Sequence, residues 1–216
     1  MNIILVGPPG AGKGTQSDKL VNVFNLHKLS TGDLLREEIN KKTTLGNEIK
    51  ITIDRGNFVS DKIINNLVNK FLVEKSFFDK LIFDGYPRNI DQAISLDKLL
   101  IKYKKKVSCV LNLDVNKEVL IKRILGRQIC SNCGLIFNKF FNPSTKENHK
   151  CKSSFLEIRS DDTDKTLIHR LDTYFKETLP VVNYYKKQDL IKEVDGNAKI
   201  DQIYKEIRHI IDSLDT

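Results

Sequence analysis

The sequence predicts an α/β fold in which a five-stranded parallel sheet is covered by helices on both faces. Short apolar runs recur along the chain, and between them lie longer amphipathic segments whose apolar residues repeat at helical spacing. Strands that alternate with helices are typical of parallel sheets, because each crossover connection places a helix on one face. A glycine-rich turn directly after the first apolar run indicates where such a sheet would bind a ligand.

The expected strands are short apolar runs at 2–6, 26–30, 81–84, 107–113 and 190–194, of which 26–30 has the weakest pattern. The expected helices are the amphipathic segments 61–72, 91–103, 114–125 and 200–214. Two segments break the alternation and are predicted to be insertions into the core. One is 30–59, which is mostly helical and polar. The other is 126–162, which carries three cysteines and has almost no helical period. The core would then comprise 1–29, 60–125 and 163–216.

Composition narrows the class of protein. The chain has 216 residues, 40% of them hydrophobic, which suits one sizeable core with small insertions. We find no apolar run of the roughly 20 residues that a membrane helix needs, and no signal-peptide pattern. Four cysteines in a chain this long do not form a disulfide framework, so we expect a reducing, cytoplasmic setting.

The net charge of +8 is concentrated in one part of the chain. Residues 121–160 contain eight basic and two acidic side chains, which is most of the excess. Such a segment would attract a polyanion, and both nucleotide phosphates and nucleic acid are candidates.

The segment "NIILVGPPGAGKGTQSDKL" predicts a strand, a phosphate-binding turn and a helix. The pattern of a phosphate-binding P-loop is G-x-x-x-x-G-K-[ST]; Gly7 to Lys13 match it, and the hydroxyl follows one residue late, at Thr15. Gly10, Gly12 and Gly14 allow backbone N–H groups to point towards a phosphate, and the helix dipole adds to their field. The segment therefore predicts a P-loop NTPase fold.

A second motif follows the third expected strand, in "LIFDGYPRNIDQA". Asp84 ends the strand where a carboxylate can hold magnesium through water, and Arg88 offers a rigid fork for phosphate. A GTPase would need N-K-x-D to recognise guanine, but Asn116 and Lys117 are followed by Val119 where the aspartate belongs.

Five motifs in order resemble the adenylate kinase family, in its long-lid form. They are "GPPGAGKGTQ", "LSTGDLLR", "FDGYPRNIDQA", "RILGR" and "RSDDT" followed by "HR", and the resemblance runs from residue 1 to about 200. It implies reversible transfer of the γ-phosphoryl of MgATP to AMP, giving two ADP. It also implies that 30–59 is an AMP-binding domain and that 126–162 is a lid that closes over the nucleotides.

The resemblance implies the following site residues. ATP would be bound by Gly10, Ala11, Gly12, Lys13, Gly14, Thr15, Arg123, Arg127, Ile136, Phe137 and Ala198. AMP would be bound by Thr31, Arg36, Asn57, Phe58, Val59, Gly85, Tyr86, Pro87, Arg88, Gln92, Arg159 and Arg170. Thr15 and Asp84 would hold magnesium indirectly. The catalytic set would be Lys13, Arg88, Arg123, Arg159 and Arg170, because phosphoryl transfer depends on positioning and positive charge.

Three rival functions remain from the sequence. A kinase for UMP or CMP usually resembles short-lid enzymes, so the insertion 126–162 favours AMP as acceptor. A kinase that uses GTP as donor also fits, since donor-base contacts are largely made by the backbone. A zinc-containing nucleic-acid-binding protein is a different class, but it would not need Arg36, Arg88 and Arg170 in these motifs. The resemblance favours a monomer that binds ATP, AMP and ADP, without nucleic acid or membrane partners.

The cysteines of the lid predict a structural zinc site with an open question. Cys130 and Cys133 form one C-x-x-C pair, but only Cys151 follows, with Ser154 where a partner should stand. A serine hydroxyl is a poor zinc ligand, so the fourth ligand would be Ser154, His149 or an aspartate, Asp161 or its neighbour Asp162, unless the lid is metal-free. Cys109, in the middle of an expected strand, is interpreted as a buried apolar residue.

Overall fold

The computed structural model of the chain describes residues 1–55, 57, 59–75 and 77–214. The parallel sheet has the order β2-β3-β1-β4-β8, and each neighbouring pair is parallel. Its strands are β1 (Asn2–Val6), β2 (His27–Ser30), β3 (Leu81–Asp84), β4 (Cys109–Asp114) and β8 (Ile191–Asp195). The predicted sheet is confirmed, including the weak strand near residue 27.

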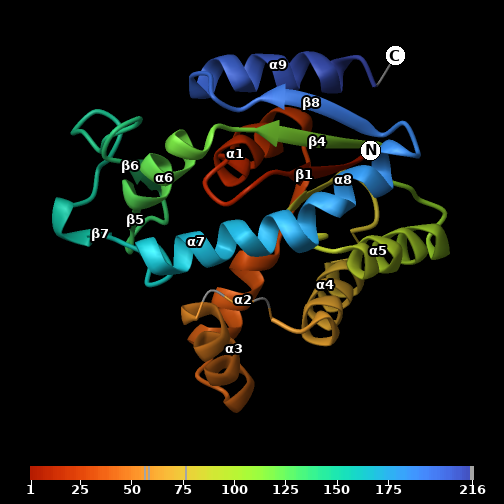
Figure 1. The fold of residues 1–216 in the computed structure, drawn as a ribbon, viewed down its shortest axis with the longest axis horizontal. Helices are drawn as coiled ribbons and strands as arrows, with labels where there is room; N and C mark the ends of the chain where they lie inside the picture. Colours follow the sequence, from red (N-terminus) through yellow and green to blue (C-terminus); the bar gives the residue numbers. More distant parts are fainter. Residues whose placement is uncertain (56, 58, 76, 215–216) are drawn as a thin grey trace.

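Helices cover both faces of this sheet (Figure 1). One face packs against α1 (Lys13–Phe24), α6 (Lys117–Leu125), α7 (Asp164–Thr173) and α9 (Ile200–Asp212). The other face packs against α4 (Asp61–Lys75), α5 (Ile90–Lys102) and α8 (Leu179–Lys186).

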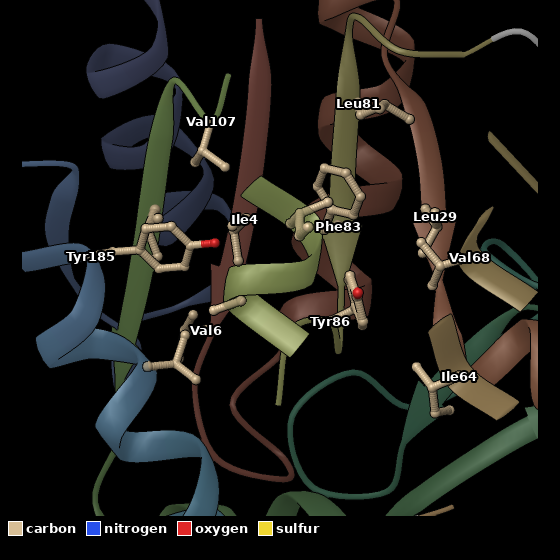
Figure 2. Close-up of a cluster of buried hydrophobic side chains, with 14 of the residues drawn as sticks. Ile4, Val6, Leu29, Ile64, Val68, Leu81, Phe83, Tyr86, Val107 and Tyr185 are labelled. Carbon is tan, nitrogen blue, oxygen red and sulfur yellow. The ribbon is translucent and has the colours of Figure 1, made fainter. Parts of the chain in front are cut away.

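The pleat of β1 explains the two cores. Ile4 and Val6 point into one buried cluster, whereas Ile3 and Leu5 point into the other, as the two-residue period of a strand requires. Figure 2 shows the first cluster, in which Phe83 of β3 and Tyr185 of α8 lie with Ile4. All five residues of β1, Asn2–Val6, are at most 2% exposed, so this central strand is buried on both faces.

The first insertion is helical, as predicted, and follows β2 directly. It contains α2 (Thr31–Asn40) and α3 (Thr44–Asp54). The Ser30 side chain caps α2 by accepting a hydrogen bond from the Asp33 backbone N–H (3.2 Å). The Thr43 side chain caps α3 by accepting one from the Gly46 backbone N–H (3.0 Å). These caps begin each helix at a defined residue, which sets how α2 leaves the edge of the sheet.

The second insertion forms a small antiparallel sheet that the sequence pattern did not predict. Its strand order is β6-β5-β7, from β5 (Arg127–Cys130), β6 (Ile136–Asn138) and β7 (Leu156–Glu157), and a short 3₁₀ turn, η1 (Ser153–Phe155), precedes β7. In Figure 1 this sheet projects beside α6 and the beginning of α7.

The chain then returns to the core through a long helical segment that sequence periodicity also missed. A π-helical turn, η2 (Tyr174–Thr178), joins α7 to α8, and Pro180 lies in the first turn of α8. Thr163 begins α7 with a reciprocal capping box to Thr166. Among the described helices, none is long and apolar enough to cross a membrane.

Candidate functional site

The phosphate-loop motif joins β1 to α1 at the carboxyl end of the sheet. Gly12 is the residue that precedes α1, and its φ of 97° lies in the left-handed region that favours glycine. No side chain caps this helix start, so its first N–H groups and the helix dipole can serve a bound anion. Ligands of open α/β sheets bind at this edge, outside the carboxyl ends of the strands.

Lys13 is held within this loop by two carbonyl groups. Its Nζ donates to the Gly7 carbonyl (2.6 Å) and to the Pro8 carbonyl (3.1 Å). Burial lowers the pKa of Lys13 to about 8; Asp84 opposes this shift, and nearby arginines, Arg88 first among them, add to it. A bound phosphate would offset the same burial cost, so the site is suited to an anion.

The carboxyl end of β3 supplies a second set of polar groups. Gly85 has a φ of 76°, and its carbonyl accepts hydrogen bonds from Thr31 Oγ1 (2.7 Å) and Arg88 Nε (2.8 Å). Burial lowers the pKa of Arg88 to about 10, with a further contribution from the charge of Arg170. Asp84, which ends β3, is in register with Leu5 on β1 and so lies beside the phosphate loop.

Two aspartates at the end of the lid segment orient two arginines. Asp162, whose side chain is fully buried, accepts a bidentate ion pair from Arg127, with Nε at 2.7 Å. Asp161 pairs with Arg170 at 2.9 Å. These contacts correct one of the candidates for the fourth zinc ligand. Asp161 and Asp162 are each paired with an arginine, and neither belongs to the cysteine cluster.

Arg159 stands apart from these ion pairs. Burial lowers its pKa to about 10, and the positive charges of Arg127 and Arg36 act in the same direction. Its Nε is buried and has no hydrogen-bond partner in the described part of the chain. An unsatisfied buried donor is costly, and an anion in the neighbouring cavity would satisfy it.

Nearly all the predicted site residues line one cavity of about 810 Å³. Its lining includes, from the predicted set, Gly10, Ala11, Gly12, Lys13, Gly14, Thr15, Thr31, Arg36, Asn57, Val59, Asp84, Gly85, Pro87, Arg88, Gln92, Arg123, Arg127, Ile136, Phe137, Arg159, Arg170 and Ala198. Phe58 lies outside the described residues. Tyr86 does not line the cavity but belongs to the buried cluster of Figure 2, and its hydroxyl donates to Asn65 (2.8 Å).

The cavity also has lining residues that sequence reasoning missed. Lys28 on β2 lies 3.9 Å from Asp84, and Phe141 of the lid stacks against the guanidinium of Arg123 at 5.6 Å. Lys28 directly precedes the buried Leu29 within β2, and a lysine inside a strand of the sheet was a usable signal. The adjacent Phe140 and Phe141 gave no such signal in the sequence, because exposed aromatic residues in a loop have many roles.

The two insertions touch each other across the cavity. Ser160 Oγ, at the end of the lid, donates to Asp54 Oδ1 of α3 (2.9 Å). Nearby, His169 Nε2 on α7 lies 2.7 Å from Asn57 Oδ1. The cavity is therefore bordered by the sheet, the first insertion and the lid together.

The lid brings together Cys130, Cys133, Cys151 and His149, with ligand atoms within 4.8 Å of one another. Nδ1 of His149 lies 2.8 Å from Ser144 Oγ, which leaves Nε2, buried and without a partner among the described residues, as a ligand atom. Burial opposes ionisation of Cys130, but backbone N–H groups, that of Cys133 first, outweigh it and lower the pKa to about 6. Three thiols and one imidazole form a donor set that could hold a metal ion.

Comparisons with known proteins agree with this geometry. A family model described as adenylate kinase matches residues 5–190. Adenylate kinase of Pelagibacter ubique is 44% identical over 211 residues, covering 98% of this chain and 99% of that protein. Those of Methanothrix thermoacetophila and Enterococcus faecalis are 40% and 38% identical, each covering 98% of this chain, and 98% and 99% of their own lengths. The matches extend over nearly the full length of this chain and of each relative, and the chain belongs to the adenylate kinase family.

Proposed function

We propose that this adenylate kinase transfers the γ-phosphoryl group of MgATP to AMP by surrounding it with Lys13, Arg88, Arg123, Arg159 and Arg170. The observation that carries this assignment is the convergence of these five cations, from the core and the lid, on one cavity. Burial lowers the pKa values of Lys13, Arg88 and Arg159, as expected for cations that await an anion.

The donor nucleotide would occupy the side of the cavity formed by the phosphate loop. Gly10 to Thr15 would bind its phosphates through backbone N–H groups, and Arg123 and Arg127 would bind them from the edge of the lid. Ile136, Phe137 and Ala198, which line the same cavity, would contact its base.

Magnesium fits the oxygen donors beside the loop. Thr15 and Asp84 both line the cavity and offer a hydroxyl and a carboxylate, the hard ligands that this ion prefers, directly or through water. When bound, the ion would neutralise charge on the phosphate oxygens of the donor.

The acceptor would occupy the side formed by the first insertion and the end of β3. Thr31, Arg36 and Arg88 would bind AMP near its phosphate and ribose, with Arg159 and Arg170 between the two nucleotides. Asn57, Val59 and Gln92 would lie at the base, and Gly85 and Pro87 would shape the turn beneath.

The arrangement supplies charge and position instead of a general base. Phosphoryl transfer passes through a loose transition state whose negative charge is spread over the equatorial oxygens. Fixed cations in a cavity that excludes water stabilise that charge more than water would. The lid, 126–162, would close over the nucleotides and prevent water from accepting the phosphoryl group.

We further propose a structural zinc ion in the lid, held by Cys130, Cys133, Cys151 and His149. Zinc prefers four nitrogen and sulfur ligands at structural sites, and thiolates are favoured at Cys130. The ion would fix the fold of the lid and take no part in phosphoryl transfer.

The organisation proposed for the whole chain has three parts. The core comprises 1–29, 60–125 and 163–216, the AMP-binding domain 30–59, and the lid 126–162. We propose a monomer, because one chain supplies every group of the site, and a cytoplasmic location, where reduced thiols persist.

The roles are tested by replacing Arg88 and measuring steady-state kinetics. We expect Arg88→Ala to lower turnover about 100-fold or more, because a cation in the transition-state shell is lost. Lys98→Ala, an exposed change on α5, is the matched control and should leave turnover unchanged. A near-normal rate for Arg88→Ala would contradict the assignment, and profiling AMP, UMP, CMP and GMP with ATP or GTP tests the substrates.

A further inference from the structure

The side-chain amide of Gln92 is held from both ends. Its Oε1 accepts the backbone N–H of Arg88 (2.8 Å), and its Nε2 donates to Asp61 Oδ1 (2.6 Å). A backbone N–H can only donate, and a carboxylate bound by N–H donors can only accept, so one of the two amide orientations satisfies both contacts and the flipped one satisfies neither. Gln92 is 2% exposed, which leaves no bulk water to compensate for a flip.

Asp61 also fixes a second amide in the same network. Asn89 Nδ2 donates to both Asp61 oxygens (3.1 and 3.0 Å), while its Oδ1 caps α5 by accepting the Gln92 backbone N–H (2.8 Å). Asp61 is the first residue of α4, so its carboxylate ties the start of α4 to the start of α5. It does not line the cavity, whereas Gln92 does.

Gln92 keeps unused hydrogen-bonding capacity for the cavity. A glutamine amide has two N–H donors and two oxygen lone pairs, and the contacts above use one of each. The lining residues Leu35, Ile53, Val59 and Ile64 are apolar and belong to, or pack against, one hydrophobic cluster. A flat base between such walls, with one amide at its edge, is a common way to bind a nucleobase.

The remaining donor and acceptor match one type of purine. Adenine presents an amino group at C6, a donor, next to N1, an acceptor. The fixed amide offers an oxygen and an N–H in the complementary order. A 6-oxopurine presents the reverse pattern, an oxygen at C6 and an N–H at N1. It would pair with Gln92 only after an amide flip, which would set Oε1 against the carboxylate of Asp61 and Nε2 against the Arg88 N–H.

We propose that Asp61 is a positioning residue that makes the acceptor site select adenine over 6-oxopurines, by fixing the amide orientation of Gln92. The inference rests on the proposed function, in which the base of AMP lies against Gln92. It assigns acceptor specificity to a carboxylate that does not contact the nucleotide.

The test compares AMP with IMP as acceptors, because IMP has the 6-oxo edge without the 2-amino group of GMP. For the unmodified protein we expect kcat/KM to favour AMP by about 100-fold or more, since mispaired buried polar groups are costly. Asp61→Asn keeps the size of the side chain but can both donate and accept, so it no longer enforces one orientation. We expect the preference for AMP to fall about tenfold, through a higher KM for AMP with kcat within about twofold and KM for ATP unchanged.

Two further variants separate this role from a structural one. Asp91→Asn, an exposed change in the first turn of α5, should leave kinetics and melting temperature unchanged. In a Gln92→Ala background, Asp61→Asn should cause no further loss of the AMP preference, because Asp61 acts through Gln92. A purely structural Asp61 would instead lower stability and activity in both backgrounds.

The outcomes are distinguishable from failure of the proposed function. An unmodified protein that does not phosphorylate AMP would overturn the proposed function itself. An unmodified protein that uses AMP and IMP equally, or an Asp61→Asn variant with the original preference, would overturn the inference about Asp61 while the kinase assignment stands.

Discussion

The buried ammonium group of Lys13 destabilises the folded chain, although the proposed phosphoryl transfer requires its charge. Below pH 8 its ammonium is charged in both the folded and the unfolded chain, and burial penalises it in the folded chain alone. Its folded pKa, about 8, is below the ordinary value of 10.5, so the unfolded chain binds more protons between these values. The penalty is therefore fully present at pH 7 and is relieved as the pH rises from 8 to 10.5.

We predict that Lys13→Met stabilises the nucleotide-free protein while it abolishes most activity. Two carbonyl contacts offset part of the burial cost, so we expect a gain of about 1 kcal/mol in unfolding free energy at pH 7. The gain should shrink towards pH 10, where the original lysine is neutral in the folded state. Urea unfolding at pH 7 and pH 10 measures it, and a variant that is less stable at pH 7 would contradict the prediction.

Some residues of the cavity could be predicted from the sequence, whereas the partners of others could not. Lys13 and Arg88 could be placed in the cavity because each follows a strand in a motif whose spacing reflects local geometry, whereas Arg170 was implied only by the family resemblance. The partners Asp161 and Asp162 could not be assigned, since an acidic pair beside three cysteines is as plausible a zinc ligand as an arginine partner. Only the path of the chain shows that Asp162 lies buried against Arg127.

At the scale of elements, the cysteine-bearing sheet of the lid is too small to stabilise itself. Its three strands have four, three and two residues, and Leu135, Phe140 and Phe155 around them are exposed. Sheets this small need packing or a cross-link. A metal held by residues from both ends of the lid loop would provide one.

We predict that metal content depends on His149 and not on Ser154. Purified protein should contain about one zinc per chain, and His149→Ala should weaken zinc binding at least tenfold, as loss of one of four ligands requires. Ser154→Ala is the matched control within the lid, and Cys109→Ala is the control for a thiol in the core; both should retain zinc. Metal analysis and melting curves with and without chelator measure this, and zinc retained by His149→Ala would exclude His149 as a ligand.

The elements differ in how well the sequence predicts them, for physical reasons. Buried parallel strands such as β1 and β4 are continuous apolar runs, because both faces are covered, and these were predicted. The lid strands have mixed polarity over two to four residues and give no periodic pattern. The segment α7 to α8 was missed because Pro180 and a π-turn interrupt the helical period, although the chain remains helical throughout.

At the scale of the whole molecule, the two insertions, 30–59 and 126–162, both contribute residues to the lining of one cavity. The Ser160–Asp54 hydrogen bond joins the lid to α3, and neither partner lies in the phosphate loop. Three arginines of the basic segment 121–160, Arg123, Arg127 and Arg159, line this cavity. Under the proposed function, the lid would bring these charges and the cover over the nucleotides together as it closes, which would couple transition-state stabilisation to exclusion of water.

The same coupling leads to a prediction for a protein without its lid. Ile129 of β5 is paired with Glu157 of β7, so the chain enters and leaves the lid at adjacent points. Residues 130–158 can thus be replaced by a short glycine–serine linker that retains Arg127 and Arg159. Such a protein should still bind AMP, but water would reach the donor. We expect the ratio of ATP hydrolysis to phosphoryl transfer to rise about tenfold or more.

Phosphate release without AMP, compared with ADP formation in its presence, gives the ratio. AMP binding and a melting curve show that the core is folded, and an unchanged ratio in a folded variant would mean that the lid does not exclude water.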